Sequence, residues 1–200
     1  MQIHIPGLPD LAWFPQEGVA TFDAENGVLE STAAPMVDWA NDSLGIERQH
    51  QACALGFPVS GDFSLSARVR VQGSRTTYDA GALAVWVDAD HWAKLCFEFS
   101  PAGERMVVSV VTNDWSDDCN STVLVADEVH YRLSRTGSAF AFHYSLDGEA
   151  WSFVRLFRLA VDAGTRVGFL SQAPMGEVCV ARFDRIHYVA QAPRDLRDGS

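Results

Sequence analysis

Hydrophobic and polar residues alternate with a period of two along most of the chain. In residues 61–71, GDFSLSARVRV, the hydrophobic side chains lie on one face of the expected strand and the serines and arginines lie on the other. The hydrophobic face holds Phe63, Leu65, Ala67, Val69 and Val71. This alternation is typical of a β-strand with one buried face. Similar segments follow, among them ALAVWV, AKLCFEF, MVVSVVTN, HYRLSRT, AFAFHYS, TRVGFLS and EVCVARFDRIHYV. Turns such as SPAGER and SLDGEAW separate them, because Gly and Asp-Gly accept the positive φ of tight turns.

No long amphipathic helix interrupts this pattern, and no linker or repeat divides the chain. Many short strands joined by turns predict an all-β protein in which two antiparallel sheets pack as a sandwich. With 200 residues, of which 48% are hydrophobic, the chain is long enough to bury a sizeable core. We expect a single domain over residues 1–190 and a polar, flexible tail over residues 191–200.

The segment 78–100, YDAGALAVWVDADHWAKLCFEFS, predicts a hairpin whose second strand carries two charges, Lys94 and Glu98. Pairing Asp88 with Trp92 keeps residues of one kind together, because a slip of one residue would exchange the faces. One face then holds Leu83, Val85, Val87, Leu95, Phe97 and Phe99. The other holds Ala82, Ala84, Trp86, Trp92, Lys94, Cys96 and Glu98. Small alanines beneath two Trp rings and two charges suggest the floor and walls of a binding groove, whereas a solvated Lys94–Glu98 ion pair is the simpler alternative.

The same segment, with those around it, resembles the DUF1349 family, a domain of unknown function. The resemblance is carried by YDAGALAVWVDADHWAKLCFEF and VVSVVTNDWSDD, by PMVDWAND upstream, and by YSLDGEAWSFVRL and VGFLSQAP downstream. It extends from about Trp13 to Val189. It implies a concanavalin A-like jelly roll, similar to lectins and glucanases, whose curved sheet forms a groove. The family's Asp-Trp segment matches Asp38 and Trp39.

We predict that a ligand-binding patch lies in this groove and contains Trp86, Trp92, Lys94 and Glu98. Residues of neighbouring segments would form its rim: Asp38, Trp39, Tyr78, Asp79, Asn113 and Trp115. Whether Thr112 or Asn113 faces the groove depends on a second register that the pattern leaves open. Aromatic rings suit the apolar faces of sugars, and Lys, Glu and Asn side chains bond to hydroxyls. The predicted function is therefore recognition of a carbohydrate or a sugar-like small molecule.

Two other functions are compatible with the same residues. A sugar-processing enzyme of glycosidase type would use Glu98 as acid or base, with Asp79 as a second carboxylate or Lys94 as the group that tunes it. Retaining glycosidases need two carboxylates about 5 Å apart, and this strand offers Glu98 alone. A regulatory protein-interaction module without sugar binding is the second alternative.

Charge and cysteine content restrict the partners further. The formal net charge of −11 argues against nucleic acid and against anionic lipid, and no apolar run is long enough to span a membrane. The four scattered cysteines and the lack of a secretory signal predict a reduced, cytoplasmic protein. We expect no cofactor and no metal, because aspartates in hairpins, such as Asp90 and Asp117, more often brace the backbone than bind calcium. The oligomeric state is not determined by the sequence.

Overall fold

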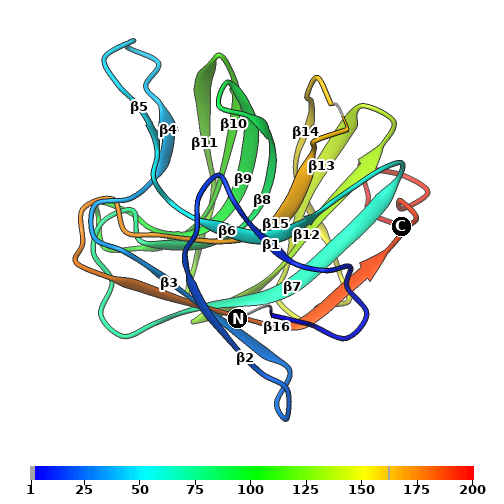
Figure 1. Ribbon diagram of the computed structural model, residues 1–200, viewed down its shortest axis with the longest axis horizontal. Helices are drawn as coiled ribbons and strands as arrows, with labels where there is room; N and C mark the ends of the chain where they lie inside the picture. The colour runs from blue at the N-terminus through cyan, green and yellow to red at the C-terminus, as the bar shows by residue number, and fades with distance from the viewer. Residues whose placement is uncertain (1–2, 162) are drawn as a thin grey trace.

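The computed structural model describes residues 3–161 and 163–200, which fold into two large antiparallel sheets packed face to face (Figure 1). The pocket sheet contains, in spatial order, β1 (Ala12–Phe14), β6 (Ala54–Pro58), β15 (Arg166–Gln172), β8 (Ala80–Asp88), β9 (His91–Phe99), β10 (Arg105–Asn113) and β11 (Trp115–Leu124). The back sheet contains β14 (Ser152–Arg158), β13 (Ala139–Ser145), β12 (Glu128–Thr136), β7 (Phe63–Gln72), β16 (Cys179–Val189), β3 (Val28–Ala33) and β2 (Val19–Asp23). The described residues contain no helix, so the predicted all-β sandwich is confirmed.

The main hydrophobic core lies between the two sheets. It is built from the inward positions of the alternating strands, including Leu65 and Val69 of β7 and Phe97 of β9, all fully buried. Tyr131 of β12 crosses this core and donates its hydroxyl hydrogen to the carbonyl oxygen of Cys96, at 2.7 Å. Gly81 stands where the sheets approach closely, since a Cβ there would lie 2.8 Å from side-chain carbons of the back sheet. The period-two pattern therefore corresponds to a real inner face.

The hairpin of β8 and β9 separates its faces as predicted, but its register differs from the predicted one. Trp86 pairs with Trp92 and Asp88 with His91, whereas we predicted Asp88 opposite Trp92. The ladder is irregular between Trp86 and Asp88, which leaves Val87 as an extra residue. Because the difference amounts to two residues, every side chain stays on its predicted face.

A second hydrophobic cluster covers part of the outer face of the pocket sheet. Its floor includes Ala82 and Ala84 of β8, and Trp39 of β4 (Trp39–Asn41) packs into it with no exposed surface. The ring centre of Trp39 lies 4.7 Å from that of Trp86 and 5.7 Å from that of Trp92. The two rings therefore pack around Trp39, which differs from the open walls that the pattern suggests.

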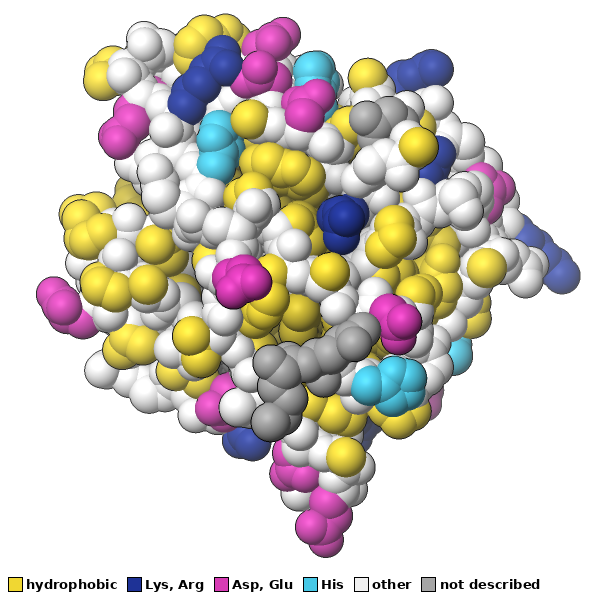
Figure 2. Space-filling view, viewed as in Figure 1, with side chains coloured by type: hydrophobic (Ala, Val, Ile, Leu, Met, Phe, Trp, Pro, Cys, Tyr) yellow, Lys and Arg dark blue, Asp and Glu magenta, His cyan; other side chains and the backbone are white. Residues whose placement is uncertain are grey.

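The β4–β5 hairpin, completed by β5 (Arg48–His50), projects from the sandwich beside β11 and β10 (Figure 1). Hydrophobic side chains gather at its end in Figure 2. In the loop between the two strands, Leu44 and Ile46 are exposed.

At the C-terminal end of the chain, residues after β16 lie against the back sheet. Arg132 of β12 donates to the carbonyl oxygen of Gly199 at 2.7 Å. No helix in the described part of the chain is long and apolar enough to cross a membrane.

Truncation of Phe97 tests the assignment of faces. We expect Phe97→Ala to lower the free energy of unfolding by about 3–5 kcal/mol, because the side chain is fully buried between the sheets. Phe153→Ala removes the same atoms from a 37% exposed position on the edge strand β14 and should cost less than about 1.5 kcal/mol. Urea denaturation measures both losses, and equal losses would contradict the assignment.

Candidate functional site

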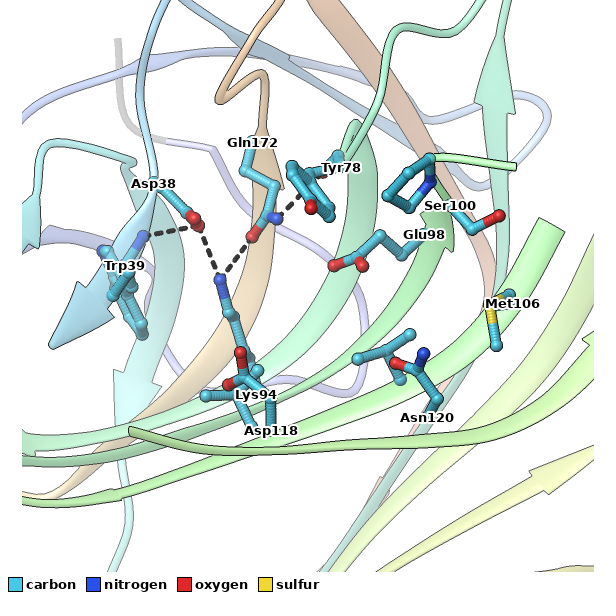
Figure 3. A pocket seen from close by; sticks show the side chains of 14 residues that line it. Asp38, Trp39, Tyr78, Lys94, Glu98, Ser100, Met106, Asp118, Asn120 and Gln172 are labelled. Atoms are coloured by element: carbon cyan, nitrogen blue, oxygen red, sulfur yellow. Dashed lines mark hydrogen bonds and ion pairs between the residues drawn. The ribbon is translucent and has the colours of Figure 1, made fainter. Parts of the chain in front are cut away.

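Lys94 of β9 is the buried charge around which the site is arranged. Its side chain is only 3% exposed, and its ammonium group donates to Asp38 Oδ1 at 2.6 Å and to Gln172 Oε1 at 2.7 Å (Figure 3). Burial alone lowers the pKa of Lys94, but the neighbouring acidic groups, Asp38 first among them, together outweigh this effect and raise the pKa overall. The partner of Lys94 is therefore Asp38, which lies 56 residues earlier in the chain, and not Glu98 of the same strand.

Asp38 is held in place by the residues that follow it. Its Oδ1 also accepts a hydrogen bond from the backbone N–H of Trp39, at 2.7 Å. The Trp39 indole N–H in turn donates to the carbonyl oxygen of Ala52 at 2.7 Å, and its ring lies in the second hydrophobic cluster. The buried ring thus fixes the position from which Asp38 reaches Lys94.

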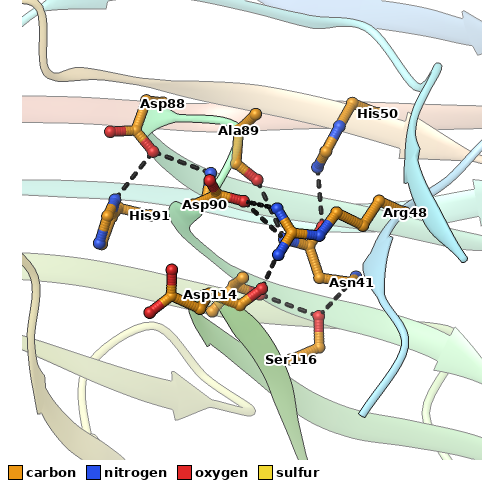
Figure 4. Close-up of polar contacts among 10 residues, drawn as sticks. Asn41, Arg48, His50, Asp88, Ala89, Asp90, His91, Asp114 and Ser116 are labelled. Atoms are coloured by element: carbon orange, nitrogen blue, oxygen red, sulfur yellow. Dashed lines mark hydrogen bonds and ion pairs between the residues drawn. The ribbon is translucent and has the colours of Figure 1, made fainter. Parts of the chain in front are cut away.

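A polar network ties the β4–β5 hairpin to the turns of the pocket sheet (Figure 4). Asn41 has no exposed surface and donates to the carbonyl oxygens of Ala89 at 3.1 Å and Asp114 at 2.9 Å. The backbone N–H of Asn41 donates to Ser116 Oγ at 2.9 Å. At the surface, Arg48 forms an ion pair with Asp90. The hairpin is therefore anchored on both turns and forms a wall of the site.

A cavity of about 370 Å³ opens beside this wall, over β9, β10 and β11 (Figure 3). Its floor is apolar and comes from alternate residues of β10, namely Met106, Val108 and Val110. Its polar and aromatic lining comes from several segments: Asp38, Trp39, Tyr78, Lys94, Glu98, Ser100, Asp118, Asn120 and Gln172. A cavity of this size, with an apolar floor and a few polar groups, has the character of a small-molecule site.

Glu98 and Asp118 are the acidic groups that remain open to a ligand. Among the residues that the structure describes, neither carboxylate has a hydrogen-bond or ion-pair partner. Burial raises the pKa of Glu98 to about 7, helped by repulsion from Asp38 and Asp118 and opposed by the attraction of Lys94. Asp118 lies at the exposed edge, yet the protein around its carboxyl group limits hydration and raises its pKa. Both groups can therefore bond to a ligand.

Tyr78 stands at the mouth of the cavity in a strained backbone conformation. Its φ is +68°, in the left-handed region that residues other than glycine seldom adopt. The conformation is held by two bonds, from its N–H to the carbonyl oxygen of Phe99 at 2.7 Å and from Gln172 Nε2 to its own carbonyl oxygen at 3.0 Å. Its side chain is 41% exposed. Such strain is common at ligand sites and places an aromatic ring at the opening.

The structure brings some of the predicted site residues together and places others elsewhere. Asp38, Trp39, Tyr78, Lys94 and Glu98 line the cavity. The remaining predicted residues, Trp86, Trp92, Asp79, Asn113 and Trp115, do not line it.

Each of these remaining residues has a structural position of its own. Trp92 is fully buried, and Asp79 is 2% exposed with its Oδ2 accepting the Thr76 N–H at 2.7 Å. Asn113 is exposed at the end of β10. The guanidinium carbon of Arg48 lies 4.7 Å from the centre of the Trp115 ring. Asp79 therefore braces the turn before β8, and Trp115 supports the hairpin.

Sequence reasoning missed Gln172, Asp118 and Asn120 as lining residues. Period two on β11 does place Asp118 and Asn120 on one face, but the strand pairing that turns this face toward Lys94 is not visible in the pattern. On β10, Thr112 shares the face of Val108 and Val110, although it is buried and bonded to Ser116 Oγ at 2.9 Å. Thr112, and not Asn113, is thus on the side of the cavity.

In the described ranges, no group of three His, Cys, Asp or Glu side chains is placed to hold a metal ion. All four cysteines are free, and burial raises the pKa of the Cys96 thiol well above its usual range.

The two packed antiparallel sheets, with a polar pocket on the outer face of one of them, define a jelly-roll sandwich of the lectin and glucanase type. The chain belongs to the DUF1349 family: residues 13–191 match the family described as "Protein of unknown function (DUF1349)". The resemblance inferred from the sequence is therefore confirmed. No curated protein matches the sequence significantly.

Solved structures share this fold at low sequence identity. A functionally unknown protein from Saccharomyces cerevisiae is 22% identical, with a TM-score of 0.80 over 90% of this chain and 96% of that one. A mutant of the GH43 protein BlXynB from Bacillus licheniformis is 15% identical, with a TM-score of 0.63 over 82% of this chain but only 33% of that protein. The exoplasmic/lumenal domain of VIP36, in its Ca²⁺/Man3GlcNAc-bound form, is 8% identical, with a TM-score of 0.54 over 92% of this chain and 85% of that chain.

The Lys94–Asp38 pair can be tested by a double-mutant cycle. Lys94→Met leaves a carboxylate that is 16% exposed without its cation, so we expect it to cost about 3–5 kcal/mol of unfolding free energy. The double variant Lys94→Met/Asp38→Leu should lose less than the sum of the single changes. Arg105→Met, which breaks an exposed ion pair with Asp127, is the control and should cost no more than about 1 kcal/mol. Additive losses in urea melts would show that the pair is not coupled.

The raised pKa of Glu98 predicts a pH dependence of stability. From about pH 4.5 to about pH 7 the unfolded chain loses this proton while the folded chain keeps it, so the free energy of unfolding falls as pH rises. We expect the wild type to lose about 3 kcal/mol relative to Glu98→Gln between pH 4 and pH 8. Glu104→Gln, at an exposed turn, is the matched control. A constant difference between wild type and Glu98→Gln across this range would refute the prediction.

Proposed function

We propose that the chain binds a carbohydrate or a sugar-like small molecule in the cavity over β9, β10 and β11. The observation that carries this proposal is a pair of carboxylates, Glu98 and Asp118, that have no hydrogen-bond or ion-pair partner among the described residues and face an apolar floor in a cavity of about 370 Å³. A sugar has hydroxyls that need acceptors and C–H faces that suit an apolar surface. The cavity offers both within one small volume.

The lining residues take different roles in this proposal. Tyr78 offers its ring to a sugar face at the opening, while Met106 and Val108 contact the ligand from the floor. Glu98 and Asn120 bond to hydroxyls, since their side chains have no partner in the part of the chain that the structure describes. Trp92 takes no part, because it is fully buried.

The similar structures add modest support. BlXynB is a GH43 protein, and VIP36 was solved with Man3GlcNAc bound. Fold similarity alone does not carry a ligand from one protein to another, and only a third of BlXynB corresponds to this chain. The proposal is therefore based mainly on the residues that line the cavity.

A sugar-processing enzyme is the second candidate, favoured by one observation. A carboxyl group with a pKa of about 7 is partly protonated at neutral pH, as a general acid requires. In this version Glu98 donates the proton, and Asp79 is not the second carboxylate because it does not line the cavity. Release of reducing sugar from a bound glycan would distinguish this candidate from simple binding.

The test is a glycan array followed by calorimetric titration of the best ligand. We expect Glu98→Gln and Asn120→Ala each to weaken binding by about 1–3 kcal/mol, because a polar group of the ligand then loses its partner. Asn113→Ala, at the other end of β10 and outside the cavity, should bind as the wild type does. Unchanged affinity in both cavity variants would remove this site from consideration, and an array without any bound glycan would favour a protein-interaction module.

A further inference from the structure

The cavity carries more negative than positive charge. Its lining contains one cation, Lys94, and three carboxylates, Asp38, Glu98 and Asp118. Lys94 is already paired with Asp38 at 2.6 Å. The two remaining carboxylates have no compensating cation among the lining residues, so a ligand enters a site with an excess of negative charge.

The placement of these two carboxylates excludes one small cation that both could bind. Lys94, Val110 and Asp118 form one row across β9, β10 and β11, whereas Glu98 lies four residues further along β9. With strands about 4.8 Å apart and a rise of about 3.3 Å per residue, the two acidic residues stand on the order of 15 Å apart along the backbone. Side chains shorten this separation, but an extended ligand suits it better than a metal ion.

Lys94 adds a donor to the same cavity. An ammonium group has three N–H bonds, and two of those on Lys94 are used, by Asp38 and Gln172. The side chain is 97% buried and still lines the cavity, so its remaining N–H has few alternatives to a ligand oxygen. A matching ligand therefore carries an acceptor oxygen near Lys94 and donor groups toward Glu98 and Asp118.

We propose that the pocket selects an amino sugar, with a protonated amine against Glu98, hydroxyl groups against Asp118 and Asn120, and an oxygen near Lys94, and that it rejects sugars bearing carboxylate, sulfate or phosphate. The amine belongs at Glu98, because this carboxyl group is the more buried of the two and a charge pair is stronger away from water. This inference rests on the proposed function, since it names the class of ligand for the same cavity.

Proton release gives the binding mode a signature of its own. The charged groups around Glu98 are Lys94 on β9, Asp38 before β4, Asp118 on β11 and Arg75 before β8. A bound ammonium favours the ionised carboxylate, and therefore lowers a pKa that is about 7 in the free protein. At pH 6, where the amine of the sugar is already protonated and Glu98 is still mostly protonated, binding should release a fraction of a proton, which calorimetry detects as a heat that varies with the ionisation enthalpy of the buffer.

The experiment compares a disaccharide of glucosamine with its N-acetylated counterpart and with a disaccharide containing glucuronic acid. We expect the amine form to bind at least about tenfold more tightly than the acetylated form, and the acid to bind least. Glu98→Gln should abolish both the preference for the amine and the release of protons. Asp118→Asn, at an exposed position, tests the same electrostatic field with little effect on folding.

Asp117→Asn is the matched control, because Asp117 is adjacent in sequence but pairs with Arg155 at 2.9 Å and does not line the cavity. It should keep the full preference for the amine. Equal affinity for the amine and acetylated forms, or a preference that survives in Glu98→Gln, would overturn the amino-sugar inference. If neutral glycans bind and the amine form does not, this inference fails while the proposed function stands; if none binds, both fail.

Discussion

The ion pair between Lys94 and Asp38 is the interaction on which the site depends. It joins a strand in the middle of the pocket sheet to the segment that enters the β4–β5 hairpin, and Gln172 of β15 completes it. An apolar pair of similar size often stabilises a fold at least as well as a buried ion pair. Its value here is positional, because a charge in this environment accepts few other partners. It holds three separate segments at one edge of the cavity.

Trp39 decides how much of the curved face remains open. The small alanines of β8 leave room above the sheet, and the Trp39 ring fills that room beside Trp86 and Trp92. What remains open is a compact cavity of about 370 Å³ beside the hairpin and Tyr78. Such a shape suits a short ligand or the end of a chain better than the interior of a polymer.

The chemistry of the cavity follows from the charges that the Lys94–Asp38 ion pair leaves unpaired. Asp38 takes up the one cation among the lining residues, so neither Glu98 nor Asp118 has an ion-pair partner of its own in the lining. The burial that leaves Glu98 only partly ionised at neutral pH also makes its protonation sensitive to any charge placed beside it. Fold similarity with lectins and glycosidases is compatible with this reading, but the residues of the cavity carry it.

The sequence by itself determined the sandwich, the family and the two faces of the β8–β9 hairpin. Period two assigns faces reliably, and an error of two residues in the β8–β9 register left Lys94 and Glu98 on the correct side. Tertiary structure alone decided which remote segment covers that side. Nothing local to Lys94 points to Asp38, and the turn role of Asp79 emerges only when its backbone partners are in place. The alternation of hydrophobic and polar residues along a strand shows which of its faces is buried. The packing of the whole fold decides which residues from distant parts of the chain meet on that face.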